Sequence, residues 1–382
     1  MTLKVLHFSS HFENCGIAKF QQYYLDAIDT TSKDISNKFF EYSPYQTRAM
    51  NREKYAEVMD VLVNELSHFD ILHIQHEFGF FRDNQLQELV DNARKTGKKI
   101  LITYHTSPDL IIIKKSLGGL GPRSIVAYLR SKRHEKRLVE SHVTPLHNVD
   151  RVLVNNAYTK NKLIDFGIDE AKISAIALPV YETTTPQESD KIARALHKQK
   201  GDIIFGCVGY LHRFKGVDKA IKALTFLPKN YKLAVLGGVK SDSDDKKLYD
   251  KLTDLVVKLN LQERVYITGV VIDDDELNSY IRETDLCVYP YDSTYYKGVS
   301  SGALSLAISN ERPVIAYPVP TFIEINQEFS QLVLTQSDSY YELAKEIGSI
   351  DIAAQTKRLK LYAHAESIKN ASIKLASIYR SL

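Results

Sequence analysis

The sequence lacks Trp altogether and has only three Cys and three Met in 382 residues. Cys15, Cys207 and Cys287 are odd in number and have no CxxC spacing, so we expect neither a disulfide framework nor a thiolate zinc site. No run of about 18 apolar residues occurs, so we expect no membrane-spanning helix. The chain starts MTLKVLHFSS and passes directly into a strand-like run, so we expect no signal peptide and a reducing, cytoplasmic setting.

Neither sign of charge dominates. The chain has 50 Lys plus Arg against 47 Asp plus Glu, a formal net charge of +3. A protein that is basic over its whole surface is therefore excluded, and we expect no nucleic-acid partner. Apolar residues make up 44% and charged residues 25%, an ordinary globular composition, and the length predicts two or three domains.

Apolar, strand-like runs alternate with amphipathic segments of helix length. The runs of the first half are residues 4–8, 70–76, 99–106, 151–157 and 173–180. Those of the second half are DIIFGCVGY, KLAVLGG, RVYITG, DLCVYPY, RPVIAYP and QLVLTQ. Runs that are apolar at nearly every position are typical of strands buried on both faces of a parallel sheet. We therefore predict an α/β protein with two doubly wound parallel sheets.

The composition also predicts where the domains end. We expect a first domain over residues 1–182 and a second over 201–355. The polar segment 183–200, with its Pro and its Thr run, is predicted to be the linker between them. Residues 356–382 carry small and aliphatic residues at three-to-four spacing, which predicts a C-terminal helix. No repeat of about 20 to 50 residues is present, which excludes solenoids and propellers.

Ligands of doubly wound sheets bind at the carboxyl ends of the strands. After the first strand, Gly16 opens a helix whose free N–H groups would suit an anion, although a tight turn alone would also explain it. His76 and Glu77 stand at a strand end, where polar groups face the cleft, whereas His73 is expected in the core. His105 ends the next strand run. For such a strand-end His, a satisfied structural role is the alternative.

Two elements of the second half favour a diphosphate. Arg213 and Lys215 precede a helix, and two cations at a helix N-terminus would hold a diphosphate well, with a solvated basic loop as the alternative. Ser300, Ser301 and Gly302 begin an apolar helix, where hydroxyls and free N–H groups can bind phosphate oxygens. Plain N-capping by Ser is the alternative there.

The acidic runs 241–245 and 273–276 each precede a helix, where acids cap free N–H groups and favour the helix dipole. We therefore interpret them as capping residues rather than metal ligands. The sequence has no HExxH or similar pair of ligands. No metal or other cofactor is expected.

One segment is strongly basic. Residues 114–137 carry eight Lys or Arg against a single Glu, with an apolar side formed by Ile125, Val126, Tyr128 and Leu129. A basic amphipathic helix is typical of an element that lies on an anionic membrane surface. The alternative is a solvated helix whose apolar side packs on the core.

Together these segments resemble glycosyltransferase family 4. The resemblance rests on GIAKFQQYYLDAI, DILHIQHEFGFF, ILITYHT, the KG after the first strand of the second half, the Ser/Gly helix before RPVIA, and RVYITGVVIDDDELNSYIRETDLCVYPY. It covers essentially the whole chain. It implies a GT-B fold of two Rossmann-like domains facing a cleft, with a C-terminal helix that crosses back to the first domain.

The resemblance further implies a retaining, metal-independent hexosyltransferase. Its donor would be a nucleotide-diphosphate sugar and its acceptor a glycan or a lipid-linked glycan, in surface polysaccharide or glycoconjugate assembly. A lipid-linked acceptor or anionic lipid would account for the basic segment 114–137. The implied location is the cytoplasm, with the inner face of the cell membrane as a peripheral site.

The resemblance also assigns roles to individual residues. His105 would lie beside the transferred sugar, and Lys215, with Arg213 nearby, would neutralise the leaving diphosphate. The backbone at Val270 and Val271 would face the base. Gly16 would approach the donor phosphates, and the helix start at 300–302 would cradle them. On the acceptor side the candidates are His76 and Glu77.

The sequence departs from the family pattern at three positions. Tyr210 stands where members often have an Arg, and Gly298 and Leu306 stand at the positions of the common Glu–seven residues–Glu pair. A branch of the family has Ser-Ser-Gly in this helix instead, and this chain resembles that branch. The missing acids leave a second hypothesis open, namely a non-catalytic GT-B-like binding or partner subunit.

Overall fold

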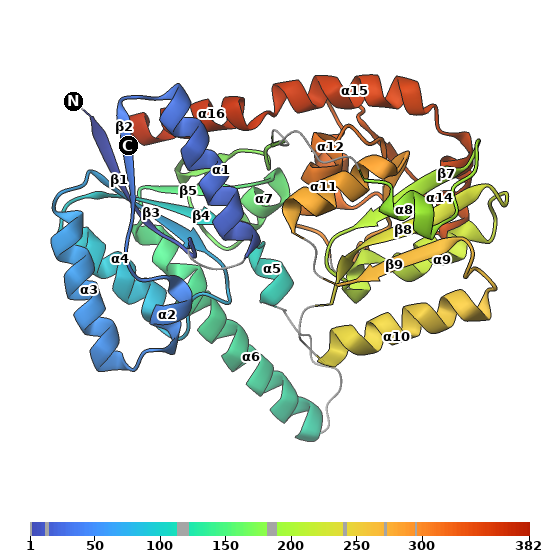
Figure 1. Cartoon of the computed structure of the whole chain (residues 1–382). Helices are drawn as coiled ribbons and strands as arrows, with labels where there is room; N and C mark the ends of the chain where they lie inside the picture. The colour runs from blue at the N-terminus through green and yellow to red at the C-terminus, as the bar shows by residue number, and fades with distance from the viewer. Residues whose placement is uncertain are drawn as a thin grey trace. The chain divides into compact units, whose positions relative to one another are not determined.

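The computed structural model describes residues 2–11, 15–112, 122–181, 189–239, 243–270, 273–294 and 296–382 (Figure 1). The chain forms two compact units. Unit 1 comprises Met1–Ala177, Gly298–Ser300 and Ile368–Leu382, and unit 2 comprises Leu178–Lys297 and Ser301–Ser367. In the described part of the chain each unit holds one six-stranded parallel sheet with helices, which confirms the predicted fold class.

The sheet of unit 1 has the strand order β2-β1-β3-β4-β5-β6. Its strands are β1 (Leu3–Phe8), β2 (Ile35–Phe39), β3 (Ile71–His76), β4 (Lys99–Tyr104), β5 (Arg151–Val154) and β6 (Ile173–Ala175). Its helices are α1 (Gly16–Thr31), α2 (Pro44–Ala49), α3 (Arg52–Leu66), α4 (Gln85–Lys95), α5 (Pro108–Ile111), α6 (Pro122–His142), α7 (Ala157–Asp165) and α16 (Ile368–Ser381), with 3₁₀ turns η1 (Thr144–Asn148) and η2 (Glu170–Lys172).

One strand of unit 1 is missing from the sequence prediction. β2 lies at the edge of the sheet, pairs only with β1 among the described strands, and reads ISNKF, with buried or partly buried residues alternating with exposed ones. An edge strand has only part of its surface in the core, so it lacks the continuous apolar run that marked its neighbours. β3, in contrast, is buried along its whole length.

The sheet of unit 2 has the strand order β12-β11-β10-β7-β8-β9. Its strands are β7 (Ile203–Val208), β8 (Tyr231–Gly238), β9 (Val265–Gly269), β10 (Leu286–Tyr289), β11 (Val314–Ala316) and β12 (Leu332–Leu334). All six overlap the predicted runs, and β8 begins one residue before its run, at Tyr231. Its helices are α8 (Lys191–Ala195), α9 (Val217–Leu224), α10 (Ser243–Lys258), α11 (Asp274–Glu283), α12 (Gly302–Ser309), α13 (Pro320–Ile325), α14 (Tyr340–Ser349) and α15 (Ile352–Ala365), with the 3₁₀ turn η3 (Arg213–Lys215).

The sequence predicted a single helix over residues 356–382. The structure instead has parts of two helices there (Figure 1). α15 ends because Glu366 and Ser367 leave the helix to pair with Val180, whose N–H donates to the Glu366 carbonyl at 2.8 Å. α16 then belongs to unit 1, as expected for a segment that returns to the first domain. There it packs on α1, and Arg380 donates two hydrogen bonds to the carboxylate of Asp34.

Part of the segment predicted as linker is folded. Residues 182–188 lie outside the described residues, but the remainder of 183–200 belongs to unit 2. There α8 packs on α11, with the side chains of Ile192 and Leu196 buried. The high polar content of the segment concealed these two apolar anchors. Among the described residues no helix is both long and apolar enough to cross a membrane.

The link between α8 and the sheet of unit 2 provides a stability test. The ammonium of Lys232 lies 2.7 Å from the Asp202 carboxylate and donates to the carbonyls of Leu196 and His197 at 2.6 and 2.9 Å. Lys232→Ala leaves the carboxylate, 9% exposed, without its cation, so we expect a loss of about 3 kcal/mol in the free energy of unfolding. Urea denaturation measures this. The control is Lys222→Ala, whose side chain is half-exposed and which should change the free energy of unfolding by less than about 0.5 kcal/mol. Equal losses in the two variants would contradict a stabilising role of the Lys232–Asp202 pair.

Candidate functional site

In unit 2 the turn after β7 brings two predicted phosphate-binding elements together. Gly209, directly after β7, has a φ of +108°, and a β-carbon there would collide with the ammonium of Lys215. The same β-carbon would lie 3.2 Å from the β-carbon of Ala303, in the first turn of α12. The Lys215 ammonium also lies 5.7 Å from the centre of the Tyr291 ring. A cation and a helix N-terminus therefore meet above Gly209.

The fold of this turn depends on a second glycine. Gly216 follows η3 with a φ of +65°, and a β-carbon there would collide with the carbonyl oxygen of Pro290 after β10. Only a residue without a side chain lets the chain turn from η3 into α9 this close to β10. The turn places Lys215 over Gly209 at the carboxyl end of the sheet.

The residues at the start of α12 have different surroundings. The hydroxyl of Ser301 accepts a hydrogen bond from the Leu304 N–H and pairs with the Tyr291 hydroxyl, both at 3.2 Å, so this buried side chain caps the helix. Gly302 is exposed, and a β-carbon there would meet no atom within 4 Å. The N-terminal turn of α12 therefore has open space at Gly302 and not at the Ser301 hydroxyl.

Ser300 and Gly298 belong to unit 1 and are held by α7. Asn156 caps α7 and donates to the Ser300 hydroxyl at 3.2 Å and to the Gly298 carbonyl at 3.3 Å. A β-carbon on Gly298 would lie 2.5 Å from the Ser107 β-carbon and 2.7 Å from Cδ1 of Tyr158. A Glu cannot occupy position 298 in this packing, which gives a steric reason for the absence of one family acid.

The remaining candidates of unit 2 lie at the surface or outside the described residues. The side chain of Arg213 is exposed within η3. Val270, after β9, is 63% exposed, an unusual environment for an apolar side chain. Val271 lies outside the described residues.

In unit 1, His105 follows β4 directly. Its Nε2 donates to the side-chain oxygen of Gln75 at 2.7 Å, and the ring of Phe20 from α1 contacts its ring edge to face at 5.3 Å. Desolvation lowers the pKa of His105 to about 4, so the ring is neutral at physiological pH. It can donate and accept hydrogen bonds but carries no charge.

The structure buries His76, which the sequence placed at the acceptor side. Its ring is fully buried, stacks on Tyr104 with centres 4.1 Å apart, and bonds His142 of α6 at 3.1 Å. Burial lowers its pKa, so it stays neutral. His76 is the last residue of β3, which is buried along its whole length, so its ring lies in the core. An acceptor cannot reach it without opening the core.

Glu77 is the next residue and is half-buried. Its carboxylate accepts a hydrogen bond from the Thr106 hydroxyl at 2.6 Å and from the Phe78 N–H at 2.9 Å. Burial raises the pKa of Glu77 and outweighs these two hydrogen bonds, which favour the charged form. Of the two acceptor-side candidates, only Glu77 has access to solvent.

Gly16 is exposed at the first position of α1, where the thiol of Cys15 caps the helix. A β-carbon on Gly16 would meet no atom within 4 Å, so the protein's own packing does not require Gly here.

The acidic run 273–276 behaves as predicted, because Asp273 caps α11 through the Glu276 N–H. In the described ranges no group of three or more His, Cys, Asp or Glu is positioned to hold a metal.

Sequence reasoning missed two residues that organise the site. Gln75 lies two residues after His73 on β3, and this pair of polar side chains on one side of an apolar strand was a usable signal. Asn156 lies in the NNA at the end of a predicted strand run and was assigned no role from the sequence. In the structure it both caps α7 and holds Gly298 and Ser300.

Two family models match the chain in succession. Residues 35–181 match the model described as Glycosyltransferase Family 4, and residues 188–365 match the one described as Glycosyl transferases group 1. Together they account for most of the chain. The two halves of the chain thus match glycosyltransferase family models, which confirms the resemblance to glycosyltransferase family 4. A curated relative, an uncharacterized glycosyltransferase of Methanocaldococcus jannaschii, is 25% identical over 223 residues, which are 58% of this chain and 53% of the relative. The chain thus spans about half the length of that relative.

Solved structures of other proteins share the GT-B fold of this chain. HepE of Anabaena has a TM-score of 0.70 at 14% identity, with all of both chains covered. Sucrose-phosphate synthase of Thermosynechococcus elongatus has a TM-score of 0.71 at 18% identity, covering 99% of this chain and 98% of that one. The trehalose 6-phosphate synthase of Burkholderia multivorans has 0.64 at 12% identity, with 100% and 98% covered. At such identities the likeness establishes the fold.

The open space at Gly302 gives a direct test of whether phosphates approach α12. Gly302→Ala fits the protein without collision and favours the helix, so we expect the melting temperature to stay equal or rise. If a donor diphosphate contacts the backbone there, the added methyl group should weaken nucleotide-diphosphate binding at least tenfold, as measured by calorimetry. Gly348→Ala in α14, where the new β-carbon makes only ordinary contact, is the matched control. Unchanged binding in Gly302→Ala would exclude the contact.

Proposed function

We propose that the protein is a retaining, metal-independent glycosyltransferase. It would move a sugar from a nucleotide-diphosphate sugar to a glycan or lipid-linked acceptor in surface polysaccharide or glycoconjugate assembly. The observation that carries the proposal is the meeting of the Lys215 ammonium with the open N-terminus of α12 above Gly209. The complexes of HepE with UDP and with UDP-glucose support a donor of this class.

The diphosphate is the group that these two elements fit. Breaking the bond between sugar and phosphate leaves negative charge on the diphosphate. A fixed ammonium and free N–H groups at a helix N-terminus stabilise that charge in the transition state without having to reorganise. Exposed Arg213 adds a second cation in the same 3₁₀ turn as Lys215. Because protein cations supply the charge, the proposed reaction needs no metal.

The sugar carbon becomes positively charged as the bond breaks. The acceptor hydroxyl attacks from the side that the diphosphate leaves, which retains the anomeric configuration. A diphosphate oxygen accepts the proton of that hydroxyl, so the proposed mechanism uses no dedicated protein base. His105 would orient the sugar through hydrogen bonds, since its neutral ring brings no positive charge to the developing cation.

Substitution of Lys215 tests the diphosphate assignment. Lys215→Met keeps the length of the side chain and removes the charge, so we expect kcat/KM for the preferred nucleotide sugar to fall about 10²-fold or more. Lys222→Met, on the exposed face of α9 nearby, is the control and should keep at least half the activity. Circular dichroism confirms folding of both proteins. Full activity in Lys215→Met would refute the assignment.

A non-catalytic subunit is the second candidate function. It is favoured by the absence of acids at positions 298 and 306, which are Gly298 and Leu306 in this chain. The packing around Gly298 also leaves no room for a Glu side chain. Calorimetry with UDP, GDP and ADP, and then with their sugars, separates the two candidates. A glycosyltransferase binds one of these nucleotides and slowly hydrolyses its sugar without acceptor. Binding of none of them favours the subunit.

We further propose that α6 rests on an anionic membrane surface. Its exposed apolar side chains are Ile125, Val126 and Leu129, which are 40 to 52% exposed. Toward the other end of the helix, Leu138 and Val139 pack on the core of unit 1 and anchor it. The exposed basic residues between are Arg130, Arg133, Lys136 and Arg137. An apolar end followed by a basic stretch would insert into the lipid surface and pair with its headgroups.

Co-sedimentation with vesicles tests this surface. Each basic residue near an anionic surface contributes about 1 kcal/mol, so Arg133→Gln with Arg137→Gln should weaken binding to phosphatidylserine vesicles about tenfold or more. The control pair, Lys251→Gln with Lys258→Gln on exposed positions of α10, should bind as the unaltered protein does. Binding to purely zwitterionic vesicles with equal strength, or no effect of the α6 pair, would contradict the proposal.

A further inference from the structure

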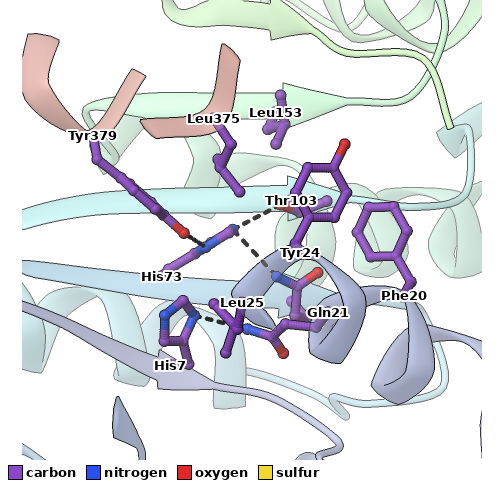
Figure 2. A pocket seen from close by; sticks show the side chains of 11 residues that line it. His7, Phe20, Gln21, Tyr24, Leu25, His73, Thr103, Leu153, Leu375 and Tyr379 are labelled. Atoms are coloured by element: carbon purple, nitrogen blue, oxygen red, sulfur yellow. Dashed lines mark hydrogen bonds between the residues drawn. The ribbon is translucent and has the colours of Figure 1, made fainter. Parts of the chain in front are cut away.

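A line of buried hydrogen bonds leads from the C-terminal helix to His105. The hydroxyl of Tyr379, on α16, lies 2.7 Å from Nδ1 of His73, and Nε2 of His73 lies 2.7 Å from the Thr103 hydroxyl (Figure 2). The amide nitrogen of Gln75 lies 3.2 Å from the same Nε2, and its oxygen lies 2.7 Å from Nε2 of His105. Tyr379, His73, Thr103 and Gln75 are each at most 2% exposed.

These contacts form one consistent pattern of donors and acceptors. The Gln75 oxygen can only accept, so Nε2 of His105 carries its proton. The Gln75 amide nitrogen can only donate, so Nε2 of His73 holds a lone pair, which also accepts from the Thr103 hydroxyl. The proton of His73 is then on Nδ1 and is donated to Tyr379. Each member of the line thus fixes the orientation of the next.

We propose that Gln75 is a positioning residue that holds His105 as the neutral Nε2–H tautomer, leaving Nδ1 to accept a hydrogen bond from a hydroxyl of the transferred sugar. This inference rests on the proposed function, because it needs a sugar beside His105. Within the described part of the chain, Nδ1 of His105 forms no hydrogen bond with another polar group and is available for such a bond.

The surroundings of His105 favour a neutral ring. From β3 the titratable groups that face it are His73 and His76, whose pKa values burial lowers so that both are neutral. From α1 it meets the apolar ring of Phe20. A carboxylate at position 75 would instead stabilise the imidazolium, as acids do beside His. An imidazolium would repel the positive charge that develops on the sugar carbon, so an amide suits the proposed reaction and an acid does not.

The central variant is Gln75→Glu, which keeps the shape and replaces the amide with a carboxylate. We expect the pKa of His105 to rise, so that the ring is protonated below that pKa and neutral above it. The transfer rate should therefore fall at least tenfold as the pH falls through the new pKa and recover at higher pH. The unaltered protein should show no such step between pH 6 and 8. Gln327→Glu, an exposed site with the same charge change, is the control.

Nitrogen-15 NMR of histidine-labelled protein reads the tautomer without any activity measurement. The His105 signal is identified by its loss in His105→Gln, and it should show a proton on Nε2. In Gln75→Leu, which removes the acceptor, the signal should move toward a mixture of tautomers, with kcat lower and KM little changed. Thermal unfolding of each variant confirms that the protein is folded.

The outcomes separate the two hypotheses. A His105 that carries its proton on Nδ1, or a Gln75→Glu enzyme with an unaltered pH profile, overturns the role of Gln75 even if the protein transfers sugar. A His105 with the expected tautomer, in a protein that neither binds nor hydrolyses any nucleotide sugar, overturns the proposed function and leaves the hydrogen-bonded line intact.

Discussion

The close packing of the turns that follow β7 and β10 in unit 2 shapes the candidate phosphate site. A side chain on Gly209 would meet the end of the Lys215 side chain, and one on Gly216 would collide with the backbone after β10. Both residues adopt positive φ, which favours glycine. The two glycines leave space for the Lys215 ammonium over the end of the sheet, beside the first turn of α12. The proposed diphosphate chemistry depends on that placement.

Much of the fold could be predicted because a strand buried on both faces must be apolar along its length. The six strands of unit 2 and five of the six in unit 1 coincide with runs of this kind to within one residue at their starts. β2 was not predicted from the sequence because an edge strand needs no such apolar run. The break between α15 and α16 was not predicted from the sequence either. It depends on pairing with Val180, nearly 190 positions earlier in the chain, which a local sequence pattern cannot indicate.

The sequence anticipated the surroundings of a candidate residue where backbone geometry determines them and not where side chains compete for partners. Gly16 and Gly302 both open onto empty space, as residues at a ligand-facing helix start would. Ser301 does not, since the Leu304 N–H and the Tyr291 hydroxyl occupy its oxygen. His76 stands at a strand end, but β3 is buried along its whole length, so its ring lies in the core. A sequence gives the position of a polar residue on a strand, whereas its partners come from other strands and helices.

The buried polar residues of β3 link the sheet of unit 1 to the C-terminal helix α16. His73 bonds both Thr103 on β4 and Tyr379 on α16, so a helix from the end of the chain completes a network inside the first domain. A buried His left without a partner would destabilise the sheet, because an unsatisfied polar group in the core costs about 1–3 kcal/mol. The return of the chain to unit 1 therefore stabilises the same network that reaches His105. If that network sets the tautomer of His105, the C-terminal helix contributes to the chemistry of a residue more than 270 positions before it.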